Sequence, residues 1–246
     1  MPALAAPLRL AMWSGPRNIS TALMRSWGNR ADTFVVDEPF YAYYLQATGA
    51  DHPMASEIIA AGETDSGKII AQLTGDPPHR ARIFYQKQMT HHLLPALDRG
   101  WLGAVTNCFL IRDPREVIAS YLKKNHEPTA DDLGFPQQAA IFETVCAETG
   151  KTPPVIDARD VLENPERSLR LLCAAVGAEF STAMLAWPPG PRPTDGIWAR
   201  HWYGEVERTT GFHSPEPKEI SIPARLYAVV EQCEKIYRHL HGYRLK

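Results

Sequence analysis

The sequence has few cysteines, and they form no metal-binding or disulfide pattern. Its 246 residues contain four cysteines, and no two of them form a C-x-x-C pair. A structural zinc site needs closely spaced thiolate or imidazole ligands. Disulfide frameworks belong to much shorter, cysteine-rich chains. We exclude both classes and expect reduced, buried thiols in a cytoplasmic protein: Cys108, Cys146, Cys173 and Cys233.

Long hydrophobic runs and an excess of charge of one sign are also missing. No apolar run approaches the roughly 20 residues of a membrane helix, and the first eight residues lack the basic start of a secretory signal peptide. The formal net charge of −2 gives no reason to expect nucleic acid or an acidic membrane as a partner. We therefore expect a cytoplasmic location without either partner. The oligomeric state stays open, with a homodimer among the options.

What is present is an alternation of strand-like and helix-like segments. Five short apolar runs read as strands covered on both faces: residues 8–13, 33–37, 82–86, 107–111 and 154–158. Helical spacing marks the segments between and after them: residues 21–29, 54–73, 91–99, 115–125, 137–149, 165–176 and 224–240. This order predicts a three-layer α/β fold with a central, mostly parallel five-stranded sheet in a single domain, residues 1–246. Ligands of such sheets bind at the carboxyl ends of the strands.

The first strand-like run leads into a polar turn and then a helix. Residues 14–18 read Ser-Gly-Pro-Arg-Asn, and Ile19, Leu23 and Trp27 follow at helical spacing. A strand, a tight loop and a helix aim backbone N–H groups and the helix dipole at one point, which suits an anion. Arg17 adds positive charge, so the loop predicts a phosphate or sulfate-ester site. An ordinary turn capped by serine and threonine is the alternative.

A second polar element follows the fourth strand-like run. Arg112 ends the run, Asp113 and Pro114 suit the start of a helix, and Ser120 lies two turns later. The planar guanidinium of Arg112 suits a phosphate, and Ser120 offers a hydroxyl beside it. A capping ion pair around Asp113 with a solvated Ser120 is the alternative.

These motifs resemble those of the sulfotransferases that use 3′-phosphoadenosine 5′-phosphosulfate (PAPS). Pro16-Arg17-x-x-Ser20-Thr21-x-Leu23 is similar to the family's 5′-phosphosulfate loop, and residues 109–121 are similar to its 3′-phosphate element. Residues 159–177 resemble the strand, helix and Leu-Gly ending that follow. The resemblance implies these cofactor-binding residues: Gly15, Pro16, Arg17, Asn18, Ile19, Ser20, Thr21, Arg112 and Ser120. Asn18-Ile19 replaces the family's usual Ser-Gly, and this difference puts the approach of the backbone to the phosphate in question.

The resemblance also points to catalytic residues near two other strand ends. Glu38 ends the second run, where sulfotransferases acting on sugars and peptides carry a catalytic carboxylate. Lys87 matches the lysine that follows the third run in the cytosolic branch, where Met89 replaces that branch's histidine. His91 and His92 are further candidates for the base. Structural roles are the alternative for each: an ion pair or helix cap for Glu38, and packing for the histidines.

Residues 187–217 are rich in proline, glycine and tryptophan and predict an irregular segment over the cofactor or substrate. Arg200, Arg208 and Lys218 are candidates for the 3′ phosphate, and Trp198 or Trp202 for stacking on adenine. Packed tryptophans under surface charge are the alternative.

The sequence thus predicts a P-loop-like sulfotransferase that moves a sulfuryl group from PAPS, without a metal, to a hydroxyl or amine of a small molecule. A nucleotide kinase or NTPase is an alternative, although the G-x-x-x-x-G-K-[ST] loop is absent. A non-catalytic nucleotide-binding protein on the same fold is another. The sequence does not name the acceptor. The aromatic residues 40–44 either line its pocket or pack in the core.

Overall fold

A computed structural model describes residues 6–123, 127–215 and 219–246 of the chain. Its centre is a five-stranded sheet in the order β2-β3-β1-β4-β5, in which every neighbouring pair is parallel. The strands are β1 (Leu8–Ser14), β2 (Thr33–Asp37), β3 (Ile83–Met89), β4 (Thr106–Ile111) and β5 (Val155–Asp157). The predicted α/β fold is therefore confirmed, and the sheet is parallel throughout.

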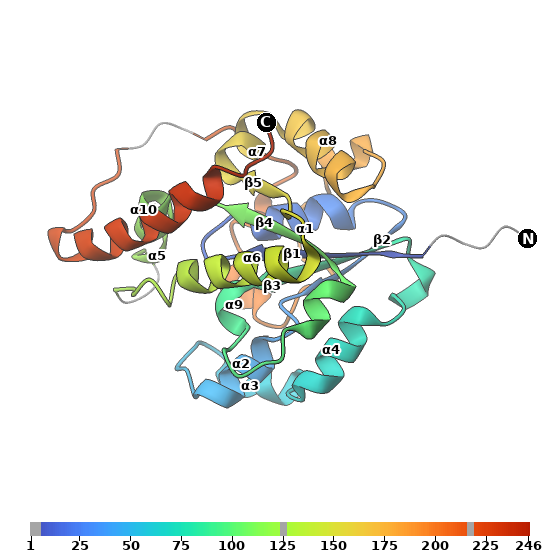
Figure 1. Ribbon diagram of the computed structural model, residues 1–246, viewed down its shortest axis with the longest axis horizontal. Helices are drawn as coiled ribbons and strands as arrows, with labels where there is room; N and C mark the ends of the chain where they lie inside the picture. The colour runs from blue at the N-terminus through green and yellow to red at the C-terminus, as the bar shows by residue number, and fades with distance from the viewer. Residues whose placement is uncertain (1–5, 124–126, 216–218) are drawn as a thin grey trace, which may run out of the picture.

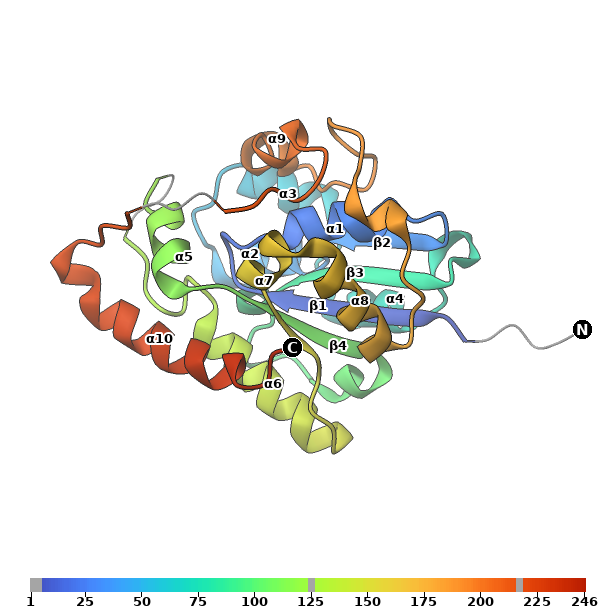
Figure 2. The ribbon, with the colours of Figure 1, turned by 90° about the horizontal axis from the view of Figure 1, so that it is seen from above.

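Helices cover both faces of the sheet and form three layers with it (Figures 1 and 2). The helices are α1 (Ser20–Gly28), α2 (Tyr41–Thr48), α3 (Ala55–Ala61), α4 (Ser66–Thr74), α5 (Pro114–Tyr121), α6 (Phe135–Thr149), α7 (Ala158–Glu163), α8 (Pro165–Val176), α9 (Ala199–Trp202) and α10 (Tyr227–His241). Within the described residues, no helix is both long and apolar enough to cross a membrane.

Alternate residues of β1 explain why both faces are covered. Leu10 and Met12 pack in one core with α1 and α8, whereas Ala11 and Trp13 pack in the other with α4 and α6. Successive side chains of a strand point to opposite faces, so an apolar strand needs a layer on each side. All four of these side chains are fully buried. The central strand is therefore a fixed base for the loop that follows it.

Side-chain caps and a glycine set the first and last residues of two predicted helices. Asp113 accepts a hydrogen bond from the Arg115 backbone N–H before α5, and Asn164 accepts one from the Arg167 N–H before α8. Gly177 ends α8 at φ 74°, a left-handed value that glycine adopts without strain. The expected helix 115–125 ends at Tyr121, and residues 124 and 125 lie outside the described part of the chain.

Two predicted helices were wrong in extent or existence. The expected helix 54–73 is divided into α3 and α4, because Gly62 is extended and Asp65 accepts hydrogen bonds from the first turn of α4. The expected helix 91–99 is replaced by the short 3₁₀ turn Thr90–His92 and an irregular stretch. Pro95 lies in the middle of this stretch and cannot donate the backbone hydrogen bond that a helix needs there.

Candidate active site

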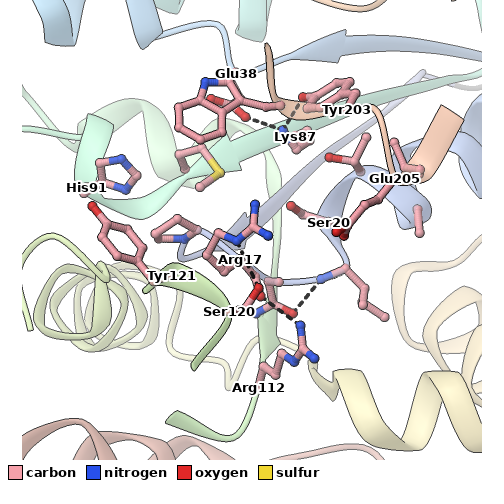
Figure 3. A pocket seen from close by; sticks show the side chains of 18 of the residues that line it. Arg17, Ser20, Glu38, Lys87, His91, Arg112, Ser120, Tyr121, Tyr203 and Glu205 are labelled. Atoms are coloured by element: carbon pink, nitrogen blue, oxygen red, sulfur yellow. Dashed lines mark hydrogen bonds and ion pairs between the residues drawn. The ribbon is translucent and has the colours of Figure 1, made fainter. Parts of the chain in front are cut away.

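A cavity of about 650 Å³ opens at the carboxyl ends of the strands (Figure 3). Its lining includes Arg17 after β1, Glu38 after β2, Lys87 of β3 and Arg112 after β4. These residues are far apart in sequence and meet because parallel strands bring their carboxyl ends to one edge. The predicted site residues at four strand ends therefore share one cavity.

The loop after β1 is held tightly against a neighbouring turn. A Cβ added to Gly15 would lie 2.3 Å from the backbone oxygen of Leu133, so only glycine fits here. Arg17 has φ 57°, in the left-handed region that a non-glycine residue enters at a cost. Its Nε donates a hydrogen bond to Oγ of Ser120 at 3.1 Å. Burial lowers the pKa of Arg17 below its ordinary value, and the guanidinium remains charged.

Asn18 and Ile19 have a local role in this loop. The Asn18 side chain accepts a hydrogen bond from the Ile19 backbone N–H at 2.9 Å and donates one to the Leu110 carbonyl at 3.3 Å. Asn18 thereby joins the loop to β4 and satisfies one loop N–H without a ligand. The family's usual Ser-Gly would leave the loop backbone flexible. In this chain the Asn18 side chain instead links the loop to β4.

Arg112 connects the two cationic elements. Its Nη1 donates to the backbone oxygen of Arg17 at 2.9 Å, and its Nε donates to Oε2 of Glu116 at 3.0 Å. Glu116 in turn accepts from Arg159 at 2.7 Å. The guanidinium is held by partners on both sides, so its orientation is fixed before any ligand binds. Arg17, Arg112 and Ser120 form one hydrogen-bonded group.

Lys87 is the centre of a buried polar cluster. Its Nζ donates to Oδ1 of Asp37 and to the Tyr203 hydroxyl at 2.9 and 2.8 Å, and it also donates to Glu38. The Tyr203 hydroxyl donates to Oδ2 of Asp37 at 2.7 Å. The two carboxylates raise the pKa of Lys87 well above its ordinary value, although burial opposes them. An ammonium has three N–H bonds, and all three are engaged here.

Glu38 presents its second carboxylate oxygen to the cavity. Burial is the largest influence on its pKa and raises it above the ordinary value, against the charge of Lys87. The residue has φ 41°, and its backbone oxygen accepts from the Tyr41 N–H at 2.9 Å, at the start of α2. Strained backbone is typical of functional positions. A buried carboxyl with a raised pKa suits proton transfer near neutral pH.

His91 and His92 also line the cavity, in an aromatic group with α2. The His92 ring stacks on Tyr41 and on Tyr44, with centroids 4.6 and 4.8 Å apart. Burial lowers the pKa of His91 to about 3 and that of His92 well below its ordinary value, so both imidazoles are neutral. The aromatic residues that the sequence left undecided therefore divide: Phe40 packs in the core, whereas Tyr41 and Tyr44 line the cavity.

The segment after residue 187 crosses the cavity, but not with the arginines that the sequence suggested. Arg200 and Arg208 are exposed and lie outside the cavity lining. Trp202 lines the cavity, whereas the Trp198 ring packs edge-on against Tyr41 at 5.1 Å. Lys218, like positions 216 and 217 at the end of the predicted segment, lies outside the described residues.

The structure adds lining residues that the sequence did not reveal. Tyr203 reaches Lys87 across 116 positions of sequence, and Asp132, Glu205 and Phe212 also line the cavity. Figure 3 shows Glu205 beside Ser20, and His91 and Tyr121 on the other side of Arg17. Tyr203, Asp132, Glu205 and Phe212 stand in no strand-end motif, so only their tertiary position identifies them.

Comparison with known proteins gives the class of this fold and site. The family model described as "Sulfotransferase domain" matches residues 8–226, so the chain belongs to the sulfotransferase domain family. The sulfotransferase domain from the curacin biosynthetic pathway covers 98% of this chain and 99% of its own, with a TM-score of 0.55 and 16% identity. A sulfotransferase from Alicyclobacillus acidocaldarius has a TM-score of 0.54, with 11% identity and 98% of each chain covered.

Two curated relatives are more similar in sequence. "Branched-chain-amino-acid aminotransferase-like protein 1" of Arabidopsis thaliana is 35% identical over 243 residues, which are 98% of this chain and 43% of that protein. "Branched-chain-amino-acid aminotransferase-like protein 2" of the same plant is 34% identical over 228 residues, 93% of this chain and 40% of that protein. The chain thus spans less than half the length of these relatives. Their names describe the longer proteins.

Proposed function

We propose that this domain transfers a sulfuryl group from PAPS to a hydroxyl or amine of a small molecule. The observation that carries the proposal is the arrangement of one cavity. Two hydrogen-bonded cationic elements, after β1 and β4, lie in the same space as a buried carboxylate after β2. The two cationic elements suit a donor nucleotide that carries phosphate groups at two positions. The carboxylate suits an acceptor that must lose a proton.

The groups after β1 and β4 suit a doubly phosphorylated nucleotide in chemical type. Arg17, Ser20 and Thr21 offer a guanidinium, hydroxyls and loop N–H groups for the 5′ phosphosulfate, with α1 directed at the same point. Arg112 and Ser120 offer a guanidinium and a hydroxyl for the 3′ phosphate. When bound, PAPS supplies an activated sulfuryl group on a good leaving group. Gly15, Asn18 and Ile19 set the shape of the loop.

Glu38 acts as the general base in this proposal. One of its oxygens is held by Lys87 and the other faces the cavity, within 4.0 Å of the His92 Nδ1. It accepts the acceptor proton as the new bond to sulfur forms. Lys87, with its three N–H bonds engaged, holds Glu38 in place and moderates its pKa. Its role is therefore positioning, and the neutral His91 is too weakly basic to replace Glu38.

Transfer of labelled sulfate from PAPS to a panel of alcohols, phenols and amines tests the proposal. We expect a sulfated product from at least one acceptor, with release of adenosine 3′,5′-bisphosphate in equal amount. The matched variant Glu38→Gln should bind the bisphosphate normally and form product far more slowly. Failure of the wild-type protein to bind the bisphosphate at millimolar concentration would contradict the assignment of the donor.

A further inference from the structure

The described lining of the cavity carries opposite charge at its two ends. Arg17 and Arg112 lie at the end where Ser120 lies, with Glu205 at its edge. Glu38 lies beside His92 at the other end. Asp51 and Asp132 also line the cavity: Asp51 precedes His52, which bonds the Tyr41 hydroxyl, and Asp132 lies two residues before Gly134, which approaches His91. In the part of the chain that the structure describes, Lys87 is the one lysine or arginine lining this second end, and it is already shared between two carboxylates.

Aromatic rings form the wall of this second end, which we call the acceptor end. Tyr41 and Tyr44 stack on His92, and His91 meets Tyr44 edge-on with centroids 5.4 Å apart. The imidazoles are neutral because burial lowers the pKa of each histidine. Aromatic faces attract a cation electrostatically, and a neutral imidazole does not repel one. Tyr41 and His92 are buried in these stacks, so the half-buried Tyr44 and His91 are the rings that a ligand reaches, and this part of the wall carries no positive charge to repel a cation.

Asp132 places a carboxylate at this wall. Its Oδ2 accepts hydrogen bonds from the Thr129 backbone N–H at 2.8 Å and from the Thr129 hydroxyl at 2.7 Å. Asp132 lines the same cavity as Tyr44 and Tyr121. Burial raises the pKa of both tyrosines, and the negative charge of Asp132 raises it further. Glu127 also lines the cavity, but it forms an ion pair with Arg225. Asp132 is thus held by its own loop in the lining of the cavity that Tyr44 and Tyr121 share.

A buried nitrogen of His92 that lacks a hydrogen-bond partner is a second indication of a ligand at this end. The residue is 2% exposed, and its Nδ1 has no hydrogen-bond partner among the described residues. This nitrogen lies 4.0 Å from Oε2 of Glu38 in the same cavity. Buried polar atoms rarely stay unpaired. A hydroxyl oxygen within hydrogen-bond reach of both groups would donate its proton to Glu38 and accept from Nδ1–H, with one lone pair left for sulfur.

From these contacts we propose that the acceptor is a hydroxyl compound that also carries a positively charged ammonium group. The hydroxyl lies between Glu38 and His92, and the ammonium lies against the aromatic wall beside Asp132. This inference rests on the proposed function. In the reaction the acceptor oxygen bonds to sulfur, its proton passes to Glu38, and the bond from sulfur to the bridging oxygen breaks. That electron pair stays on adenosine 3′,5′-bisphosphate.

Matched acceptors that differ in charge and little in shape test the inference. Calorimetric titration in the presence of the bisphosphate compares tyramine with 4-propylphenol, and choline with 3,3-dimethylbutan-1-ol. We expect the cationic member of at least one pair to bind about tenfold more tightly, the ratio that about 1.4 kcal/mol gives. Equal binding within both pairs, or tighter binding of the neutral members, would overturn the proposal.

Two neighbouring aspartates provide the control. Asp132→Asn keeps an oxygen for the Thr129 hydrogen bonds but removes the charge, and it should abolish most of the tenfold preference. Asp131→Asn removes an equal charge from a residue that bonds Gln137 outside the cavity lining, and it should leave the preference unchanged. Equal effects of the two variants would overturn the role of Asp132.

The same titrations separate the two proposals. Repeated without nucleotide, they report on the cation site even if the bisphosphate does not bind. Binding of the cations together with no binding of the bisphosphate would refute the proposed donor and support the acceptor end described here. Turnover with PAPS that favours neutral or anionic acceptors would refute the acceptor class and leave the proposed function intact.

Discussion

The two ends of the cavity differ in how the chain builds them. One end contains Arg17, Arg112 and Ser120, and we call it the donor end. Its two arginines follow adjacent strands, and each is accompanied by hydroxyls on the helix that starts next. At the acceptor end, Glu38 and Lys87 meet Tyr203 from a distant segment and sit against a wall from α2. Each residue of the donor end therefore stands in a short contiguous motif. The acceptor end also depends on Tyr203, which no local motif marks and which only folding brings to Lys87.

The ends also differ in how their charges are balanced. Arg112 is paired with Glu116 at a partly exposed position and connects to Arg17 through a backbone oxygen. Lys87 and Asp37 are almost fully buried, with side chains 2% and 1% exposed. Buried charges that lose a partner destabilise the fold, whereas exposed ones lose little. Changes at the donor end should thus affect binding, and changes at the acceptor end should affect rate and stability.

The largest expected effect is on turnover, from Glu38→Gln. Loss of a general base typically lowers the rate by roughly two to four decades, while the bisphosphate should bind with unchanged affinity. In the wild-type protein the carboxylate must be ionised to act, so kcat should rise with pH through the raised pKa of Glu38. The acid limb should lie above the ordinary glutamate value of 4.5. A fully active Glu38→Gln would transfer the role of base to another group.

Next comes stability, through Lys87→Met. The change leaves Asp37 and Glu38 buried without their cation, and the free energy of unfolding should fall by about 3–5 kcal/mol. Urea unfolding measures it. Lys235→Met is the control, since Lys235 pairs with Glu231 on the exposed side of α10, and its cost should stay within about 0.5 kcal/mol. Equal costs for the two variants would show that the cluster does not act as a unit.

Donor affinity should respond to Arg112→Ala. Loss of its charge-assisted hydrogen bonds should weaken bisphosphate binding by about 1.5–3 kcal/mol, with kcat at saturating PAPS little changed. Arg115→Ala removes an exposed arginine that pairs with Glu234 outside the cavity lining, and it should bind the bisphosphate as the wild-type does. Calorimetry decides. Unchanged affinity in Arg112→Ala would remove this residue from the donor site.

The smallest expected effect is that of Tyr203→Phe. The ring stays, but Asp37 loses a hydrogen bond and one N–H of Lys87 loses its acceptor. The free energy of unfolding should fall by about 1–3 kcal/mol, with bisphosphate affinity unchanged. Tyr227→Phe, at a position 58% exposed, should have no measurable effect. If the two variants unfold alike, Tyr203 adds nothing to the cluster.

The sequence predicts the residues of the donor end better than those of the acceptor end. The strands could be predicted because short apolar runs mark them, and contiguous motifs pointed to Arg17, Arg112 and Ser120, which the structure places in the cavity lining. Tyr203 and Asp132 could not be predicted, because their partners are distant in sequence and no local pattern marks them. The expected helix at 91–99 is absent, because Pro95 in its middle cannot donate the backbone hydrogen bond that a helix needs there.

The central claim is that the cavity binds a nucleotide with phosphates at both its 3′ and 5′ positions. Titration calorimetry with adenosine 3′,5′-bisphosphate, and separately with ATP and Mg²⁺, tests this claim directly. We predict tight binding of the bisphosphate without Mg²⁺, much weaker binding of ATP, and weaker binding of the bisphosphate by Arg112→Ala. Tight binding of ATP that requires Mg²⁺, with no binding of the bisphosphate, would contradict it.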